Sequence, residues 1–150
     1  MNNFNDIFNK NYDFKGSAHA RVNLIGEHTD YTGGYVLPML LKYKTDVYIS
    51  QNKKRNIVHS ALYNETKSFN NLYKSKNNHW SDYIKGCIFA INSNFKLEKN
   101  YFNIFIKSNI FINRGISSSS ALCVSFLKAL NNYYKLNIGD KNLAFLAQKV

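Results

Sequence analysis

Apolar and polar residues alternate along much of the first half of the chain, which is the pattern of strands with one buried face. Val47 and Ile49, for example, lie two positions apart within a short apolar run. Four segments have strand character: residues 21–25, 35–41, 46–50 and 56–62. Their order predicts an antiparallel sheet in this half of the chain.

From residue 80 the spacing of apolar residues changes to that of an amphipathic helix. The inward positions of this helix are Trp80, Tyr83, Ile84, Cys87, Ile88 and Ile91. Residues 101–112 return to the strand pattern, with one apolar face made by Phe102, Ile104 and Ile106.

Two more helices are expected in the last third of the chain. One follows the serine run and is apolar at Leu122, Phe126 and Leu130. The other begins near Asp140, which suits an N-cap. Its buried face is expected to carry Leu143, Leu146, Ala147 and Val150. Strands and helices that do not strictly alternate predict an α+β two-layer domain.

Composition suits one cytoplasmic domain. The chain has 150 residues, of which 45% are hydrophobic, enough for a packed core. No window has the apolar length of a membrane span, and the Asn-rich start lacks the apolar centre of a signal peptide. Cys87 and Cys123 are too few and too isolated for a disulfide framework, so two reduced, packed thiols are expected.

The charge of +11 raises the question of nucleic-acid binding, because basic surfaces bind phosphate backbones. The lysines are scattered from Lys10 to Lys149, however. The tight cluster at residues 53–55 lies between two expected strands, where a solvated turn is the simpler interpretation. We therefore expect neither nucleic acid nor a membrane as partner.

The stretch RVNLIGEHTDYTGGYVLPM, residues 21–39, gathers more polar groups than a turn needs. Glu27, His28 and Asp30 offer the acceptors and the switchable donor that the hydroxyls of a polyol require. Arg21 can stabilise phosphate charge, which dominates catalysis of phosphoryl transfer. The alternative is a turn with incidental surface charges.

A second stretch, GISSSSA at residues 115–121, lies between an expected strand and an expected helix. Backbone N–H groups and the positive end of the helix dipole favour an anion there, and phosphate is the obvious candidate. Consecutive hydroxyls can add hydrogen bonds or a magnesium ligand. Ordinary helix capping by serine is the alternative.

Together these stretches resemble the galactokinases of the GHMP kinase superfamily. RVNLIGEHTDYTGGYVLPM is very similar to the galactokinase signature, and RGISSSSALCV resembles the superfamily's phosphate-binding motif. WSDYIKGCI is similar to a third motif, a family helix. The resemblance implies a GHMP kinase N-terminal domain of the ribosomal protein S5 domain 2-like fold, with an antiparallel or mixed sheet and helices on one face.

The resemblance also implies roles for single residues. Arg21 matches the arginine that stabilises the transferring phosphoryl group, and Ser119 matches the serine that binds Mg²⁺. The galactose-contacting positions are Glu27, His28, Thr29 and Asp30. The positions for ATP are Gly115, Ser117 and Ser118 at the phosphates, with Trp80 and Tyr83 beside the adenine. For the two aromatic residues, core packing of their helix is the other interpretation, and both can hold together.

The chain departs from the family pattern in several places. His19-Ala20 replaces Pro-Gly, Phe111 replaces a proline and Asn113 replaces a glycine. The magnesium-binding glutamate, the aspartate thought to act as base and the C-terminal domain have no counterpart in this chain. Residues 1–16 are expected to be an N-terminal extension, and residues 17–150 an incomplete GHMP kinase N-terminal domain.

Three functions remain open at this point. The first is a galactokinase-like enzyme that uses ATP and Mg²⁺ to convert galactose to galactose 1-phosphate, with a separate C-terminal kinase fragment as partner. The second is a non-catalytic galactose- or ATP-binding protein or sensor. The third is a basic scaffold without a ligand. A domain lacking half of its cleft is expected to expose apolar surface and to be marginally stable.

Overall fold

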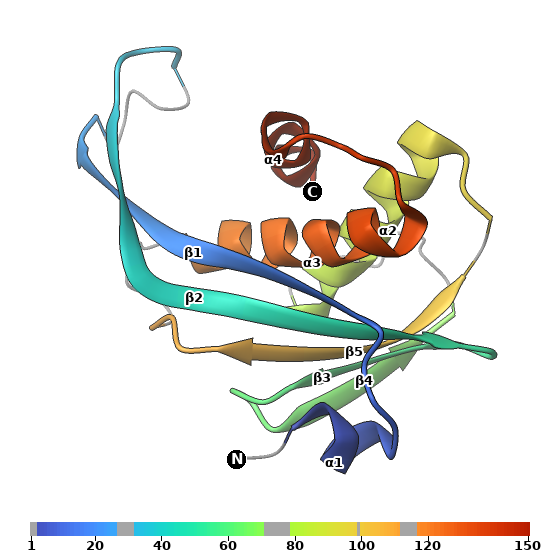
Figure 1. Ribbon diagram of the computed structural model, residues 1–150. Coiled ribbons are helices and arrows are strands. Elements are labelled where there is room, and N and C mark those ends of the chain that lie inside the picture. Colours follow the sequence, from blue (N-terminus) through green and yellow to red (C-terminus); the bar gives the residue numbers. More distant parts are fainter. Residues whose placement is uncertain (1–2, 27–31, 71–78, 99, 112–116) are drawn as a thin grey trace.

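The computed structural model describes residues 3–26, 32–70, 79–98, 100–111 and 117–150, which form a mixed sheet with helices packed on it (Figure 1). In chain order the elements are α1 (Phe4–Phe8), β1 (Phe14–Ile25), β2 (Leu37–Asn52), β3 (Asn56–Ser60), β4 (Glu65–Phe69), α2 (Ser81–Phe95), β5 (Tyr101–Ser108), α3 (Ser118–Tyr134) and α4 (Asp140–Gln148). The expected α+β class and mixed sheet are confirmed.

The sheet has the strand order β1-β2-β5-β3-β4. Neighbouring strands are antiparallel except β3 and β5, which are parallel and pair from Ile57 with Asn103 to Ser60 with Ile106. Between β3 and β5 the chain passes through β4 and α2. β5 is the last strand in the sequence, yet it lies in the middle of the sheet.

The main core lies between the sheet and helices α2, α3 and α4, which cover one face (Figure 1). The predicted apolar face of β5, made by Phe102, Ile104 and Ile106, is buried there. Phe126 and Leu130 of α3 meet it from the helical layer. Burial of these side chains is the main stabilising contribution of the fold, at about 1.5–3 kcal/mol for each large apolar side chain.

β1 and α3 approach closely because β1 carries a glycine at their contact. A Cβ atom built on Gly16 would lie 1.9 Å from the carbonyl oxygen of Ser125 and 2.7 Å from the backbone nitrogen of Ala129. Such separations are far below van der Waals contact, so only glycine fits here without a shift of the strand or the helix. This contact sets the distance between β1 and α3.

The short helix α1 covers part of the opposite face of the sheet (Figure 1). Its first turn is closed by a capping box between Asn3 and Asp6. Phe4 is buried, and its ring centroid lies 6.5 Å from that of Phe105 in β5. Hydrophobic periodicity did not predict this helix, because it is only five residues long.

The strand boundaries differ from those predicted. Residues 35–41 and 46–50 were expected to form two strands, but residues 37–52 form one, β2. The prediction divided the strand because polar residues in its middle resemble a loop. Of these, Lys42 is exposed, whereas Thr45 and Asp46 are buried. β1 begins at Phe14 rather than at Arg21, β3 ends at Ser60, β5 ends at Ser108, and β4 was not predicted at all.

Three predictions about the helices were also wrong. α4 ends at Gln148, so Val150, which was expected on its inward face, lies beyond the helix and is exposed. Gly139 is the N-cap of α4, and Asp140 is the first helical residue. Tyr83 was expected on the inward face of α2 but is 41% exposed. Other predictions are confirmed, since residues 53–55 are exposed between β2 and β3 and the two cysteines are free and buried. Within the described part of the chain, no helix combines the length and hydropathy of a membrane span.

Candidate active site

A small apolar cluster joins the strand residue before Arg21 to the start of α3. Ala20 of β1 is fully buried and forms one small core cluster with Ile110 and with Ala121 in the first turn of α3. Arg21 follows Ala20 directly in β1, and residues 118–120 precede Ala121 in α3. The alanine that replaces the family's glycine is therefore part of this packing.

The pairing of β1 with β2 is irregular at the same point. His19 pairs with Lys44 but Arg21 pairs with Leu40, so β2 contributes extra residues between them. Nδ1 of His19 makes a hydrogen bond with the carbonyl oxygen of Leu41 at 2.9 Å. Such irregularities bend and twist strands, and Figure 1 shows β1 and β2 curving away from the sheet at this end. Arg21 is half-buried at the bend.

The start of α3 has backbone donors that the helix itself does not use. Its first intrahelical bond runs from the Ala121 N–H to the Ser117 carbonyl oxygen at 3.0 Å. The N–H groups of Ser118, Ser119 and Ser120 precede that bond and therefore have no partner within the helix. They form a positive helix end with no acidic residue in the first turn, where an anion is stabilised.

Ser117 does not act as an ordinary cap. Its backbone is left-handed, with φ of 57° and ψ of 42°, and its side chain makes no capping hydrogen bond. A non-glycine residue in this region is uncommon, and such conformations concentrate at functional sites. The capping explanation of the serine run is therefore not supported at Ser117, which favours the anion-binding explanation.

The described residues fit a magnesium ion only in part. Half-buried Ser119 offers one hydroxyl oxygen in the first turn of α3. The described part of the chain contains no cluster of three or more His, Cys, Asp or Glu residues able to hold a metal. Mg²⁺ in kinases is commonly held by few protein ligands together with substrate phosphates and water. A single serine ligand is compatible with that mode.

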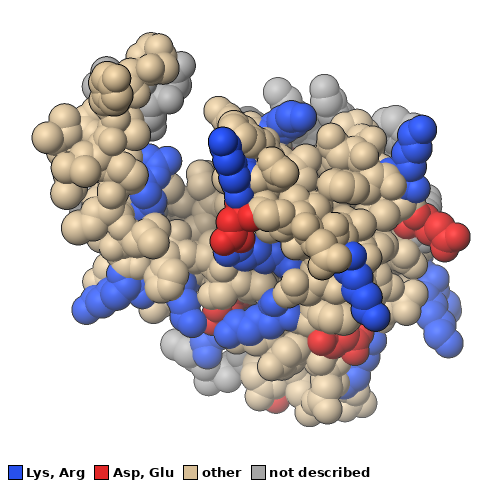
Figure 2. Space-filling model, turned by 45° about the horizontal axis from the view of Figure 1, so that its top comes forward, with Lys and Arg blue, Asp and Glu red and all other residues tan. Residues whose placement is uncertain are grey.

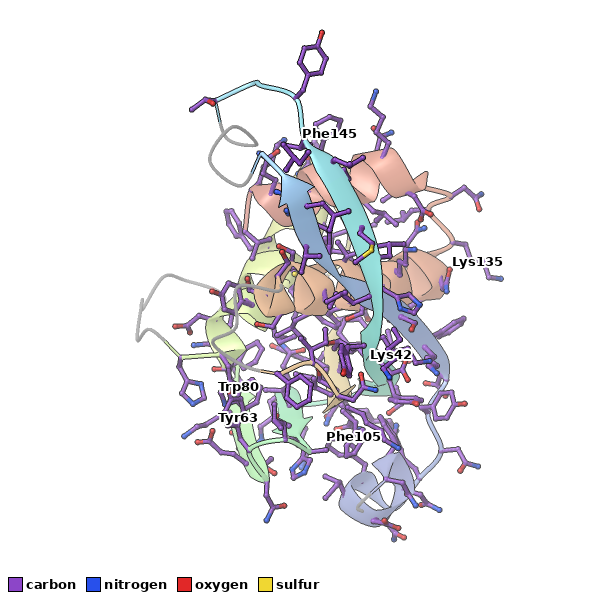
Figure 3. All side chains as sticks on the ribbon, turned by 90° about the vertical axis from the view of Figure 1, so that its left-hand side faces the viewer. Lys42, Tyr63, Trp80, Phe105, Lys135 and Phe145 are labelled. Atoms are coloured by element: carbon purple, nitrogen blue, oxygen red, sulfur yellow. The ribbon has the colours of Figure 1, made fainter. Side chains whose placement is uncertain are left out.

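Trp80 lies at the start of α2 and is held by neighbours from two other elements. Its indole Nε1–H donates to Oε2 of Glu65 in β4 at 2.8 Å. Its ring lies nearly parallel to that of Tyr63, with an interplanar angle of 15° and centroids 6.1 Å apart. Figure 3 labels the two residues next to one another. Tyr83 is one turn further along α2 and is exposed.

Hydrogen bonds from Lys67 and Trp80 stabilise the ionised form of the Glu65 carboxyl. A hydrogen bond from Lys67 at 2.7 Å, followed by the bond from Trp80, lowers the pKa of the Glu65 carboxyl to about 2. The carboxylate is therefore ionised and accepting at neutral pH. No sequence pattern indicated this cluster, because β4 lacks a clear apolar pattern and the contact with Trp80 joins residues fifteen positions apart.

α2, which begins after Trp80, and α3, which begins with the serine run, are in direct contact through their cysteines. Sγ of Cys87 donates to the carbonyl oxygen of Cys123 at 3.8 Å. Cys87 is seven residues after Trp80, which corresponds to about two helical turns or ~10 Å. Cys123 lies in the second turn of α3. The aromatic residues therefore precede this contact along α2, and the serine run precedes it along α3.

The remaining predicted site residues, namely Glu27, His28, Thr29, Asp30 and Gly115, lie outside the described residues. Arg21 follows Ala20 in β1, and Ser117, Ser118 and Ser119 precede Ala121 at the start of α3, so both groups border the cluster of Ala20, Ile110 and Ala121 in sequence. Trp80 and Tyr83 occupy the start of α2. The roles of all these residues remain predictions.

Beyond the bend, β1 and β2 pair only with one another, since β5 pairs with β2 at residues 45–52. This strand extension, residues 21–25 and 35–41, exposes large apolar side chains. Leu24, Ile25, Leu37, Met39 and Leu40 are 44–71% exposed. Figure 2 shows the projection at upper left, where the described residues near its tip are neither Lys, Arg, Asp nor Glu, with an open notch between it and the rest of the molecule.

Comparison with known proteins places these features in a family. Residues 2–51 match the galactokinase galactose-binding signature, and residues 82–150 match the GHMP kinases N terminal domain. The chain is 38% identical over 134 residues to the galactokinase of Pyrococcus furiosus, covering 87% of this chain and 36% of that protein. It is 32% identical over 151 residues to the galactokinase of Clostridium acetobutylicum, with 97% and 39% covered.

Solved structures agree with these sequence matches. The crystal structure of Lactococcus lactis galactokinase complexed with galactose superposes with a TM-score of 0.89 at 29% identity, over 97% of this chain and 39% of that chain. The Methanococcus jannaschii mevalonate kinase superposes with a TM-score of 0.74 at 24% identity, over 89% of this chain and 44% of that chain, and shows the shared fold alone.

The mixed sheet, the uncapped serine-rich helix and these matches define the N-terminal domain of a GHMP kinase. Within that class, the chain belongs to the galactokinase family and corresponds to the N-terminal part of its members. It spans less than two-fifths of the length of the galactokinases described above.

Proposed function

We propose that the chain is the N-terminal part of a kinase that transfers the γ-phosphoryl group of ATP to the anomeric hydroxyl of galactose. The observation that supports the proposal is the buried cluster of Ala20, Ile110 and Ala121, which joins the strand residue before Arg21 to the first turn of α3, a helix whose N-cap Ser117 makes no side-chain capping bond. An arginine and a positive helix end at one place can neutralise a triphosphate in phosphoryl transfer. The relatives are named as galactokinases, which favours a kinase over a non-catalytic sensor.

In this proposal the chain's own residues bind and orient. The backbone N–H groups at residues 117–120 bind phosphate oxygens, and Arg21 stabilises the charge of the transferring group. Trp80 and Tyr83 contact the adenine. Gly115 completes the phosphate loop, and the galactose hydroxyls are bound by Glu27, His28, Thr29 and Asp30. Magnesium, when bound with ATP through Ser119, would supply further charge neutralisation.

The reaction breaks the bond between the γ-phosphorus and the ADP oxygen and forms one to the sugar oxygen. The proton of the anomeric hydroxyl must pass to a base. We propose that this base, and most of the protein ligands of magnesium, come from a polypeptide corresponding to the remaining part of the longer relatives. A cytoplasmic location belongs to the same proposal and is supported by the free, buried thiols.

The strand extension supports this partner. Five apolar side chains that are 44–71% exposed form a surface that water solvates poorly, so covering it is favourable. The extension also flanks the Arg21 bend, where the sugar-binding stretch begins. A polypeptide that packs on this surface would therefore lie close to the proposed site.

A reconstitution assay tests the proposal. The 150-residue chain is mixed with a polypeptide equivalent to the C-terminal part of a galactokinase, and transfer from labelled ATP is measured with galactose or with glucose. We expect transfer that depends on galactose. A folded complex that remains inactive under these conditions would contradict the proposal.

Two variants examine the site itself. Arg21→Ala in the complex should lower kcat by about 10²–10³-fold, the usual cost of removing one charge-stabilising group. Arg55→Ala is the matched control, because Arg55 is exposed in the turn before β3. Asp30→Ala should weaken galactose binding and leave ATP binding unchanged. Equal activity of the Arg21 and Arg55 variants would rule out the role of Arg21.

A further inference from the structure

The orientation of the Trp80 ring depends on a polar network that joins β4 to the start of α2. Indole nitrogen has a single donor, and Trp80 gives it to Oε2 of Glu65 at 2.8 Å. Turning the ring over would break that bond and leave the N–H without this acceptor. Tyr63 stacks on the ring as well, so two neighbours fix its plane.

Both carboxylate oxygens of Glu65 have partners of their own. Oε1 pairs with Nζ of Lys67 at 2.7 Å, and Oε2 also accepts from Nε2 of His79 at 3.2 Å. His79 is oriented by Ser81, whose backbone N–H donates to Nδ1 at 3.3 Å. Because Nδ1 accepts, Nε2 carries the hydrogen of the neutral ring and donates it to Glu65.

An edge strand does not need such a network for its own stability. β4 pairs only with β3, and Thr66, Lys67 and Ser68 are exposed. Exposed ion pairs of this kind contribute little to folding. The group that the network restrains most is the flat ring of Trp80, and a ring held in one plane is what a stacked planar ligand requires.

We propose that Glu65 is a positioning residue for nucleotide binding, which holds the Trp80 indole in the plane against which the base of ATP packs. This inference rests on the proposed function, because it assumes that Trp80 contacts the adenine. Glu65 acts through Trp80 and does not touch the phosphates, which are assigned to the start of α3. Lys67 and His79 in turn hold the carboxylate.

The test compares two probes on the 150-residue chain by calorimetry: ATP, and inorganic tripolyphosphate, which lacks a base. Glu65→Ala should weaken ATP binding about tenfold, the effect of losing one hydrogen bond to a charged group. Binding of tripolyphosphate should not change. Glu65→Gln retains an acceptor oxygen for the indole and should recover most of the ATP affinity. Glu98→Ala is the control: it removes an exposed acid outside the network, and its ATP affinity should match that of the unaltered chain.

Fluorescence gives an independent readout, since Trp80 is the single tryptophan. In Glu65→Ala its emission should shift to longer wavelength and become more accessible to acrylamide, while circular dichroism stays unchanged. A merely structural role would weaken both probes equally, and that result would overturn the inference, as would unchanged ATP affinity in Glu65→Ala. If the unaltered chain binds both probes and Glu65→Ala binds ATP equally well, the inference fails alone. If it binds neither, the proposed function fails with it.

Discussion

The imidazole ring of His59 lies parallel to the phenyl ring of Phe105, with centroids 5.6 Å apart and 11° between their planes. His59 is 3% exposed on the face of the sheet opposite α3, and Figure 3 labels Phe105 in this region. Nδ1 of His59 bonds to Oγ1 of Thr66 at 2.8 Å, whereas Nε2 has no hydrogen-bond partner among the described residues. The stack therefore accommodates a neutral imidazole.

The free energy of unfolding should consequently fall in mild acid, because the buried His59 resists protonation in the folded chain. Burial lowers the pKa of His59 below its usual 6.5, so the unfolded chain takes up the proton at a higher pH than the folded chain does. The contribution is complete above pH 6.5 and is lost as the pH falls below that value. His59→Leu should remove this part of the pH dependence, which urea midpoints at pH 7 and pH 5 would measure.

Thr66→Val is the control for this prediction, because it keeps the imidazole and should keep the pH dependence. If the midpoints of His59→Leu and the unaltered chain fell in parallel from pH 7 to pH 5, His59 would not be the responsible group.

Gly16→Ala should destabilise the domain by about 1–3 kcal/mol or more, the usual cost of overpacking. The added methyl group meets backbone atoms of Ser125 and Ala129, which cannot rotate away as a side chain can. Urea unfolding monitored by circular dichroism measures the loss. Gly139→Ala is the matched control, since no atom lies within 4 Å of the Cβ position there. Equal stability of the two variants would contradict close packing at Gly16.

The isolated chain should associate through its strand extension. Exposed apolar area of this kind is commonly covered by a partner, so sedimentation velocity should show concentration-dependent oligomers. Replacing Ile25 and Leu40 together by Gln should reduce association, whereas Leu62→Gln, an exposed apolar residue before β4, should not. A monomer that unfolds cooperatively with a normal dependence on urea would contradict both the association and the expected marginal stability.

The two thiols should be protected in the folded chain. Burial raises the pKa of the Cys87 thiol, and both cysteines are enclosed between α2 and α3. Reaction with an aromatic disulfide reagent at pH 8 should be at least about a hundredfold slower than in urea, since it requires local opening. Ser93→Cys, at an exposed position, should add one fast-reacting thiol. Fast labelling of the unaltered chain would contradict the packing.

Sequence patterns predicted the long helices and the buried face of β5 because these depend on local periodicity. α2, α3 and α4 each carry enough turns for the helical spacing to be evident. The merger of two expected strands into β2 could not be seen, because Lys42 and Lys44 look like loop residues when their strand is not known. The parallel pairing of β3 with β5 is non-local and leaves no mark on either segment.

The candidate site was predicted from the two motifs, whereas its geometry was not. Nothing in the sequence indicated that Ala20 and Ala121 belong to one buried cluster, although this cluster joins the strand of the first motif to the helix of the second. Glu65 was missed for a similar reason: its partner Trp80 belongs to another element, and only the fold brings the carboxylate to the indole.

The central position of β5 has a consequence for the synthesis of the chain. β1 with β2 and β3 with β4 can each form an antiparallel pair as they emerge, and together these pairs present four unpaired strand edges. Unpaired edges are templates for pairing with other chains. When residues 101–108 insert between β2 and β3, the two outer edges of the sheet remain. A ribosome that stalls before Ser108 would therefore hold a nascent chain much more prone to aggregate than one that has passed it.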